Sequence, residues 1–409
     1  MRLFLLTFCC FLGLSNFSFA GSGSSGDDHS HDDGHGHGFN PQSTAFHHIA
    51  DANVYGIGPI NIPLPCILYS KDDGLAMFSS GKFDIIPHNG PRETEGWAHG
   101  DGHAAYQKYV LNSGMVMRVV DPSFPAEKVK IDGFIHKKEG KKHKYYTVYQ
   151  GKEYELEKST TADFGVFGGG FTSFYDFSLT KNATSMLLIC LLMGWFFISM
   201  ARSYKNNEGR APTGANNLME SIFVFIQDEV AKPFLGHKWE QFLPFLMSLF
   251  FFILGLNLFG QIPFLGGSNV TGNLAVTAVL AIFTFLMTNF NGNKHYWEHT
   301  LWMPGVPAWL KLFILTPVEV LGLFIKPVTL MLRLFANITA GHMVLVIFTG
   351  LIFLFGKENL GASIGSAIPA GILTLFMMSI ELLVAFIQAF VFTILTASYL
   401  GMATEEAHH

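Results

Sequence analysis

The sequence predicts an all-α polytopic membrane protein with about five membrane helices, an interfacial amphipathic helix and a small β-containing exported N-terminal domain. Of its 409 residues, 49% are hydrophobic and only 14% are charged, whereas soluble domains carry about 25% charged residues. The charged residues are concentrated before Lys181, and the long apolar runs come after it. The chain therefore divides into a polar part and a membrane part. Its net charge of −5 gives no sign of nucleic-acid binding.

Residues 1–20 have the pattern of a secretory signal peptide. Arg2 supplies the basic start, and Leu3 to Leu14 form an apolar core too short to cross a bilayer. Ser18 and Ala20 are small residues suited to a cleavage site. A short uncleaved anchor is the alternative. The signal indicates export of the polar part of the chain and a place in a bacterial inner membrane.

Residues 21–40 are rich in Gly, Ser, Asp and His and are expected to be disordered, because they have almost nothing apolar to bury. Four histidines in this segment offer a weak metal-binding possibility, although composition favours a solvated linker. These are His29, His31, His35 and His37.

Residues 41–180 are predicted to form an extracytoplasmic β-rich domain. Two short runs, 145–149 and 153–156, flank Gln150-Gly151-Lys152 and read as a hairpin. Val116, Arg118 and Val120 alternate crudely, as in a strand. Cys66 and Cys190 lie in different parts and are not expected to pair. We find no catalytic constellation here, and five polar residues of a Gly-rich stretch are interpreted as ordinary surface: Asp84, His88, His99, Asp101 and His103.

The membrane part, residues 181–409, contains its predicted elements in a simple order. Residues 183–200 form a first uncharged span, and residues 216–236 have helical spacing with one apolar face, which fits a helix on the membrane surface. Two further spans and two longer apolar runs come next: 242–259, 274–290, 312–355 and 364–400. The loop 201–241 is rich in Lys and Arg, whereas 261–272 has no charge, so the N-terminal domain is expected outside and the C-terminus in the cytoplasm.

The last two apolar runs are too long for upright helices. As a single helix, 312–355 would be about 65 Å long, about twice the hydrocarbon thickness. We expect it to break or to lie strongly tilted, with Pro317 and Pro327 as kink sites. The run 364–400 has the same excess, so the two are expected to form a long tilted hairpin.

Two polar stripes cross this apolar hairpin. Glu319, Lys326 and Arg333 recur at seven-residue spacing, nearly two helical turns, and Asn337 and His342 extend the stripe. The second run contains Glu381 and Gln388, again seven residues apart. Ionisable groups inside membrane helices each cost at least about 2.5 kcal/mol. Stripes of them indicate a path for ions rather than a device for stability.

Arg333 has a particular chemical meaning in such a path. A guanidinium does not release its proton at physiological pH, but as a fixed positive charge it lowers the pKa of a carboxylate that approaches it. Ala336 and Ala340 are small residues four apart, which allow another helix to approach closely. A partner helix with a carboxylate is therefore one interpretation. The other is a buried ion pair, Arg333 with Glu381, that fixes helix register.

The run Glu319-x6-Lys326-Pro327-x5-Arg333-Leu334-Phe335-Ala336-Asn337-x3-Gly341-His342 resembles subunit a of rotary (F-type) ATP synthases, as does Glu381-x6-Gln388-Ala389-Phe390-Val391-Phe392. The resemblance covers roughly residues 181–406 and says nothing about the domain before them. It implies that Arg333 is the essential arginine facing the ring of c subunits. It also implies a proton path of two half-channels through Glu319, Asn337, His342, Glu381 and Gln388.

The resemblance further implies partners and limits. It implies the c-ring, the peripheral-stalk subunit b and membrane lipid as partners, and no cofactor. The chain is not an enzyme by itself, because it has no phosphate-binding loop. One departure is that Gly260 and Gln261 stand where some family members have acidic residues. The outer half-channel is then expected to be lined by other groups, with Glu319, His342 and Glu381 as candidates.

Two other functions remain open at this level. A secondary transporter for an ion or metal would use the His-rich segment as a collector, but it predicts inverted repeats, which the sequence does not show. A non-transporting membrane scaffold for the exported domain leaves the two polar stripes unexplained. The choice between proton and sodium as the ion is also open.

Overall fold

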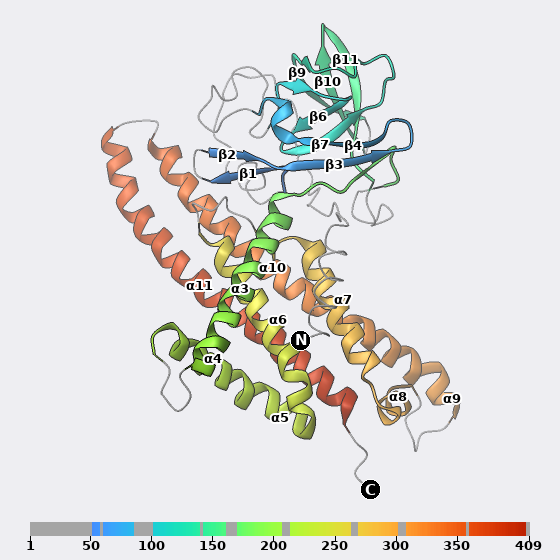
Figure 1. Cartoon of the computed structure of the whole chain (residues 1–409), viewed down its shortest axis with the longest axis vertical. Coiled ribbons are helices and arrows are strands. Elements are labelled where there is room, and N and C mark those ends of the chain that lie inside the picture. The colour runs from blue at the N-terminus through green and yellow to red at the C-terminus, as the bar shows by residue number, and fades with distance from the viewer. Residues whose placement is uncertain are drawn as a thin grey trace.

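The computed structural model describes residues 51–405, apart from 58–59, 86–100, 140–141, 161–169, 207–212, 263–268, 302–307 and 357–359. Within helices, several side chains are not described, among them that of His342 and most of those at the turn of the last hairpin. The predicted signal peptide, the His29 to His37 segment, His88 and His99 lie outside the described residues. Figure 1 shows a β-rich domain at one end of a group of long helices.

The β-rich domain contains antiparallel sheets only, among its described strands. The larger sheet has the order β6 (Tyr109–Asn112), β7 (Met115–Val119), β11 (Lys152–Glu157), β10 (Lys142–Tyr149) and β9 (Gly133–Glu139). A three-stranded sheet has the order β12 (Phe174–Asp176), β3 (Pro65–Ser70) and β4 (Gly74–Ser79). The remaining strands pair in twos: β1 (Val54–Ile57) with β2 (Ile60–Pro63), and β5 (Ala104–Ala105) with β8 (Val129–Lys130).

The hairpin predicted around Gln150-Gly151-Lys152 is confirmed as β10–β11. Tyr149 pairs directly with Lys152, so the turn has two residues and Lys152 already belongs to the strand. Gln150 and Gly151 have φ values of 52° and 73°, as the tight primed hairpin turns require. Glycine adopts this conformation without steric cost.

The core of the domain lies between the three-stranded sheet and the first strands of the larger sheet. Cys66, Leu68 and Phe174 face it from one side, and Tyr109 and Leu111 from the other. Burial raises the pKa of the Cys66 thiol to about 12, and Cys66 and Cys190 are free cysteines. The expectation that Asp101 is a surface residue is wrong. Its side chain is buried and accepts a hydrogen bond from the Ser113 N–H at 2.5 Å, which offsets part of the cost of burying the carboxylate.

The membrane part consists of α3 (Lys181–Asn206), α6 (Trp239–Gly260), α7 (Leu274–Phe290), α10 (Thr316–Gly356) and α11 (Leu360–Thr404), with shorter helices between them. Four described stretches are long and apolar enough to cross a membrane, and Leu274–Phe290 is a shorter apolar helix. The short elements are α4 (Ala215–Ile226), a π-helix (Gln227–Ala231), α5 (Lys232–Leu235), α8 (Lys294–Leu301) and α9 (Ala308–Leu310).

The amphipathic segment predicted at 216–236 is α4, the π-helix and α5. Its predicted apolar face is the face that packs on the helix core: Ile226 and Val230 are fully buried, and Met219 packs beside them. At Gly236 the chain has a φ of 52° and leaves the helix. Figure 1 shows α6 rising in a different direction from α4 and α5.

The last two helices are the long hairpin that the sequence predicts. α10 has 41 residues and α11 has 45, which correspond to about 60 and 67 Å. Pro327 and Pro369 lie inside them without ending either helix. Pro317 is the second residue of α10 and follows directly on a second π-helix (Lys311–Leu315), which continues from α9, so the predicted kink site lies at a change of helix type. Helices of this length fit the hydrocarbon layer only when tilted.

The β-rich domain is bonded directly to the first turn of α3. The N–H groups of Leu179 and Lys181 donate to the carbonyl oxygens of Pro65 and Ala52, at 3.1 and 2.7 Å. The Asn182 N–H donates to the Asp51 carboxylate at 3.1 Å. We call the membrane face near these bonds the domain side, and the face near the ends of α3 and α11 at Asn206 and Thr404 the far side.

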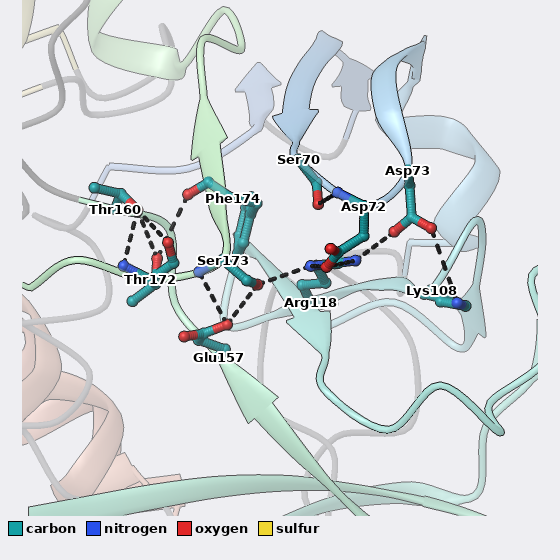
Figure 2. A network of polar contacts seen from close by, with 10 residues as sticks. All are labelled: Ser70, Asp72, Asp73, Lys108, Arg118, Glu157, Thr160, Thr172, Ser173 and Phe174. Carbon is teal, nitrogen blue, oxygen red and sulfur yellow. Dashed lines mark hydrogen bonds and ion pairs between the residues drawn. The ribbon is translucent and has the colours of Figure 1, made fainter.

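A polar network inside the domain joins its sheets around Arg118 (Figure 2). The crude alternation of Val116, Arg118 and Val120 is typical of a strand with one exposed face, but Val116 to Val119 are all buried. The guanidinium donates to Asp72 at 3.2 Å, to Asp73, and to the Ser173 hydroxyl at 2.9 Å. Ser173 in turn donates to Glu157 at 2.6 Å. Arg118 thus links the β3–β4 turn to β7, β11 and the segment before β12.

Replacing Arg118 with alanine is expected to destabilise the β-rich domain by about 2 to 4 kcal/mol, because Asp73 loses its buried partner. Amide hydrogen exchange of the whole chain in lipid measures this as faster exchange in β3, β4 and β7. Lys137→Ala is the matched control, since it removes the largely exposed pair with Glu153 and is expected to change stability by less than about 1 kcal/mol. Equal effects of the two substitutions would contradict the role of the Arg118 network.

Candidate functional site

Arg333 lies near the middle of α10 on an exposed face of the hairpin. Ala336, Asn337 and Ala340 are exposed on the same face, one and two turns further on. Among the described residues, no carboxylate lies within 4.0 Å of the Arg333 guanidinium. A cation, an amide and two small residues therefore form an open surface on an otherwise apolar helix.

The alternative of a buried Arg333–Glu381 ion pair is wrong. Glu381 is buried and lies against Gly341 of α10, where a Cβ would be 3.5 Å from its carboxylate. Gly341 is eight residues beyond Arg333, or about 12 Å along the helix. The antiparallel register of the two helices thus separates the two charges.

A polar cavity surrounds Glu381 toward the domain side. The Gln261 amide donates to the Glu381 carbonyl oxygen at 2.9 Å, and the Asn257 amide donates to the Ala385 carbonyl oxygen at 3.1 Å. The Thr271 hydroxyl donates to the Asn257 side chain at 2.7 Å. The cavity is lined by Leu256, Asn257, Gly260, Gln261, Asn269, Thr271, Ile338 and Glu381. Amides and hydroxyls from α6 and the loop before α7 thus surround one buried carboxyl group.

A second cavity, with a mixed polar and apolar lining, lies toward the far side, between α7, α8, α10 and α11. It is lined by Ala281, Thr284, Phe285, Thr288, Asn289, Tyr296, Leu323, Lys326, Pro327, Leu330 and Tyr399. The Lys326 ammonium lies 5.4 Å from the centre of the Tyr399 ring, a distance at which a cation is attracted to an aromatic face. The Thr284 hydroxyl and the side-chain amide oxygen of Asn289 are buried without a hydrogen-bond partner among the described residues. Such groups suit a hydrated cavity.

The register of α10 and α11 puts Arg333 between these two cavities. Lys326 and Gly341 lie seven residues before it and eight after it, or about 10 and 12 Å along the helix. Since Lys326 faces Tyr399 and Gly341 faces Glu381, Gln388 lies within about one helical turn of the Arg333 level. Gln388 is buried, unlike Arg333.

The expectation that Glu319 lines the same cavity as Glu381 is wrong. Glu319 lies in the first turn of α10, toward the far side. It is 22 residues from Gly341, or about 33 Å along the helix. Its carboxylate lies near Tyr296 of α8, whose phenol pKa is raised by burial and then by this charge. The backbone of His342 belongs to α10, but its side chain is not described.

Sequence reasoning overlooked most of the uncharged polar residues of the two cavities. Asn257, Thr271, Thr284 and Thr288 are single amides or hydroxyls within apolar runs, and such residues often bond only to their own helix. Gln261 was noted as a departure from the acidic residues of some family members, and the structure brings it to Glu381. Their shared signal is a set of polar residues at helix ends that face one another only after packing.

Comparison with known proteins matches the two parts of the chain separately. Residues 183–401 match the family described as "ATP synthase A chain". Residues 44–167 match a family described as "Domain of unknown function (DUF8433)". The first match includes both polar stripes and both cavities.

Several bacterial proteins are similar to the membrane part. ATP synthase subunit a of Chloroherpeton thalassium is 41% identical over 247 residues, 59% of this chain and 70% of that protein. ATP synthase subunit a 2 of Chlorobaculum tepidum is 40% identical, over 56% of this chain and 64% of that protein. ATP synthase subunit a of Myxococcus xanthus is 40% identical, over 57% of this chain and 75% of that protein.

The two cavities are expected to open to opposite sides of the membrane. In sealed vesicles, Thr271→Cys is expected to react with a membrane-impermeant thiol reagent from the domain side only, and Thr288→Cys from the far side only. The measurement is the fraction labelled with reagent inside or outside the vesicle. Ile253→Cys, at a fully buried position of α6, is the control and is expected to stay unlabelled. Labelling of both cavity residues from one side would contradict this arrangement.

Proposed function

The chain belongs to the ATP synthase A chain family, as a proton-translocating membrane subunit of an F-type ATP synthase, and from this premise we propose that Arg333 is its essential fixed charge. The observation that carries the proposal is the position of Arg333. It lies on an open face of α10, between a polar cavity toward the domain side and a cavity with Lys326 and two threonines toward the far side. In the proposed mechanism, each cavity forms the inner part of one aqueous half-channel.

The exposed face around Arg333 is proposed to contact the ring of c subunits. A ring carboxylate in the hydrocarbon layer stays protonated, because low dielectric disfavours its charged form. When it comes close to the Arg333 guanidinium, its pKa falls and it releases its proton into one half-channel. Ala336 and Ala340 let the ring helix approach, and Asn337 offers an amide to the same carboxyl group.

Arg333 does not carry the proton itself in this mechanism, since a guanidinium group keeps its proton in proteins. Its charge repels cations in the direct route between the two cavities and thereby prevents a leak. Glu381, with His342 one residue beyond Gly341, forms the proton path on the domain side, and Gln388 supports the site near the level of Arg333. Glu319 belongs to the path on the far side, together with the cavity at Lys326.

The gap between Arg333 and either cavity supports alternating access through a moving partner. About 10 Å separates Arg333 from the level of Lys326 along α10, which is too far for one hydrogen bond. A carboxylate that rotates past the hairpin bridges this gap in steps. Each proton that crosses 100 mV yields about 2.3 kcal/mol, so several steps are needed for each ATP made by the other subunits of the complex.

The proposal also includes the orientation of the chain in the membrane and the partners that cover its exposed apolar faces. The domain side is proposed to be the outside of a bacterial inner membrane, with the C-terminus in the cytoplasm, because the described basic residues Arg202, Lys205, Lys232 and Lys238 lie toward the far side. The peripheral-stalk subunit b and lipid are proposed to cover the exposed apolar faces outside the ring contact.

Arg333→Ala is expected to abolish proton-driven ATP synthesis while the complex still assembles, because the ring carboxylate no longer ionises at the stator. The measurement is ATP synthesis in sealed vesicles energised by a proton gradient, with subunit content checked by purification. Arg202→Ala removes an exposed cation at the end of α3 and is the matched control, expected to retain synthesis. Synthesis at the parent rate in the Arg333→Ala complex would refute the assignment.

Glu381→Gln is expected to slow passive proton flow through the complex by about tenfold or more, equivalent to a barrier increase of about 1.4 kcal/mol. The reason is that an amide occupies the same space in the cavity but exchanges no proton with water. Flow is measured as the decay of a pH gradient in vesicles from which the nucleotide-binding part has been removed. Glu240→Gln, at an exposed position in the first turn of α6, is the control, and equal flow in both variants would exclude Glu381 from the path.

A further inference from the structure

The three-stranded sheet of the β-rich domain has one face in the core and one face that is both apolar and exposed. Cys66, Leu68 and Phe174 point inward. The neighbouring residues point outward and have large exposed fractions: Tyr69 44%, Leu75 62%, Met77 67%, Tyr175 38% and Phe177 44%. We call this set, with the partly buried Ile67, the apolar sheet face.

The strand register makes these side chains one continuous patch. Tyr69 of β3 is paired with Leu75 of β4 on one side and with Tyr175 of β12 on the other. Ile67 is paired with Met77, and its carbonyl oxygen accepts a hydrogen bond from the Phe177 N–H at 2.8 Å. The rings of Tyr175 and Phe177 are stacked with centroids 6.4 Å apart. Two cross-strand rows of three apolar residues therefore lie side by side.

No charged residue occupies an outward position of this patch among the described strand residues. The other outward residues of β3 and β4 are Pro65 and Ser79. Asp176, the only acidic residue within β12, alternates to the opposite face, and burial raises the pKa of its carboxyl group. An exposed sheet face on water usually carries polar residues in alternation with the core positions. This one does not.

The apolar sheet face points toward the membrane part of the molecule. The inward residues of β3 pack against Tyr109 and Leu111 of β6, so the outward residues lie on the other side of the sheet. In Figure 1, β6 lies above β3, and the helices lie below β3. The outward side of the sheet therefore faces the helices and the medium around these helices.

The height of the sheet above the hydrocarbon layer can be judged from α3. The first turn of this helix is enclosed by the domain, because Lys181, Asn182 and Ser185 are buried. Leu188 is the first large apolar residue of α3 that is exposed. It lies seven residues after Lys181, or about 10 Å along the axis. The polar interface of one leaflet is about 5 to 8 Å thick, so the outward side chains of the sheet reach its depth.

We propose that the apolar sheet face rests in the headgroup region of the bilayer on the domain side, as a second membrane contact beside α3. The proposal depends only on α3 crossing the membrane, so it stands or falls separately from the role of Arg333. Continuity supports lipid as the occupant: Phe177 is four residues before the first residue of α3, and the bonds of Leu179 and Lys181 fix the sheet to that helix.

The chemistry of the patch also suits this occupant. Tyrosine combines an apolar ring with a polar hydroxyl and is enriched at membrane interfaces. Tyr69 on the central strand β3 and Tyr175 on the edge strand β12 are adjacent, and the aliphatic side chains on β4 are those that enter the acyl boundary. Held at two places, by α3 and by this sheet, the domain cannot swing about the top of a single helix.

The proposal is tested with the full chain in phosphatidylcholine nanodiscs, with a fluorescent thiol probe at Met77→Cys. Cys66 is buried with a thiol pKa of about 12, so it is not expected to react at neutral pH, and the parent chain labelled in parallel gives the background from other cysteines. The matched control is Lys152→Cys, at an exposed position of β11 in the other sheet. Quenching is measured with nitroxide attached to the lipid headgroup and, separately, with iodide in water.

The expected result is quenching of the Met77→Cys probe by headgroup nitroxide at least several-fold stronger than that of the Lys152→Cys probe, with protection from iodide. Adding Tyr175→Ser and Leu75→Ser to the Met77→Cys chain is expected to weaken the nitroxide quenching, because the patch loses most of its apolar area. Equal nitroxide quenching at the two positions overturns the proposal. If protection from iodide at Met77→Cys accompanies that result, a protein surface covers the face instead of lipid.

Discussion

The free energy of placing a charge in the hydrocarbon layer is the constraint on which the membrane part of this molecule depends. A guanidinium near the middle of a 41-residue apolar helix is costly unless water or a counter-charge reaches it. The hairpin meets this constraint without an internal ion pair at Arg333. Instead it gathers amides, hydroxyls, Lys326 and Glu381 into two cavities on either side of the Arg333 level. In the proposed mechanism, this charge interacts with a carboxylate that the c-ring brings to it.

The register between α10 and α11 determines where the two cavities lie relative to Arg333. Contacts at Lys326–Tyr399 and Gly341–Glu381 fix the two helices lengthwise. A glycine at 341 allows Glu381 to lie close against α10. The Asn257 and Gln261 amides donate to carbonyl oxygens of α11, so α6 holds the same register from the other side. A shift of one turn would move a cavity by about 5.4 Å relative to Arg333.

The β-rich domain, outside the membrane helices, also contains a buried charge. Its buried cation, Arg118, bonds to two carboxylates of the β3–β4 turn and to a hydroxyl of the segment before β12, and its first contact with α3 is made through backbone hydrogen bonds. Because of both features, the domain is joined rigidly to α3 rather than through a flexible linker. An apolar face held at headgroup height is consistent with that rigidity.

The sequence by itself determined the division into two parts, the long apolar hairpin, the β10–β11 turn and the identity of the polar stripes, because these depend on local periodicity and on residues close in the chain. Tertiary structure alone decided which groups share a cavity. Glu319 and Glu381 have the same chemistry and lie on adjacent helices, yet antiparallel packing puts them on opposite sides of the Arg333 level. The hydrogen bonds of Gln261 to Glu381 and of Thr271 to Asn257 form only when the helices pack. Arg118 reads as one residue of an alternating strand, although packing on both sides of β7 buries it. Such placements depend on which faces meet, and that is a property of the packed chain rather than of any short stretch of it.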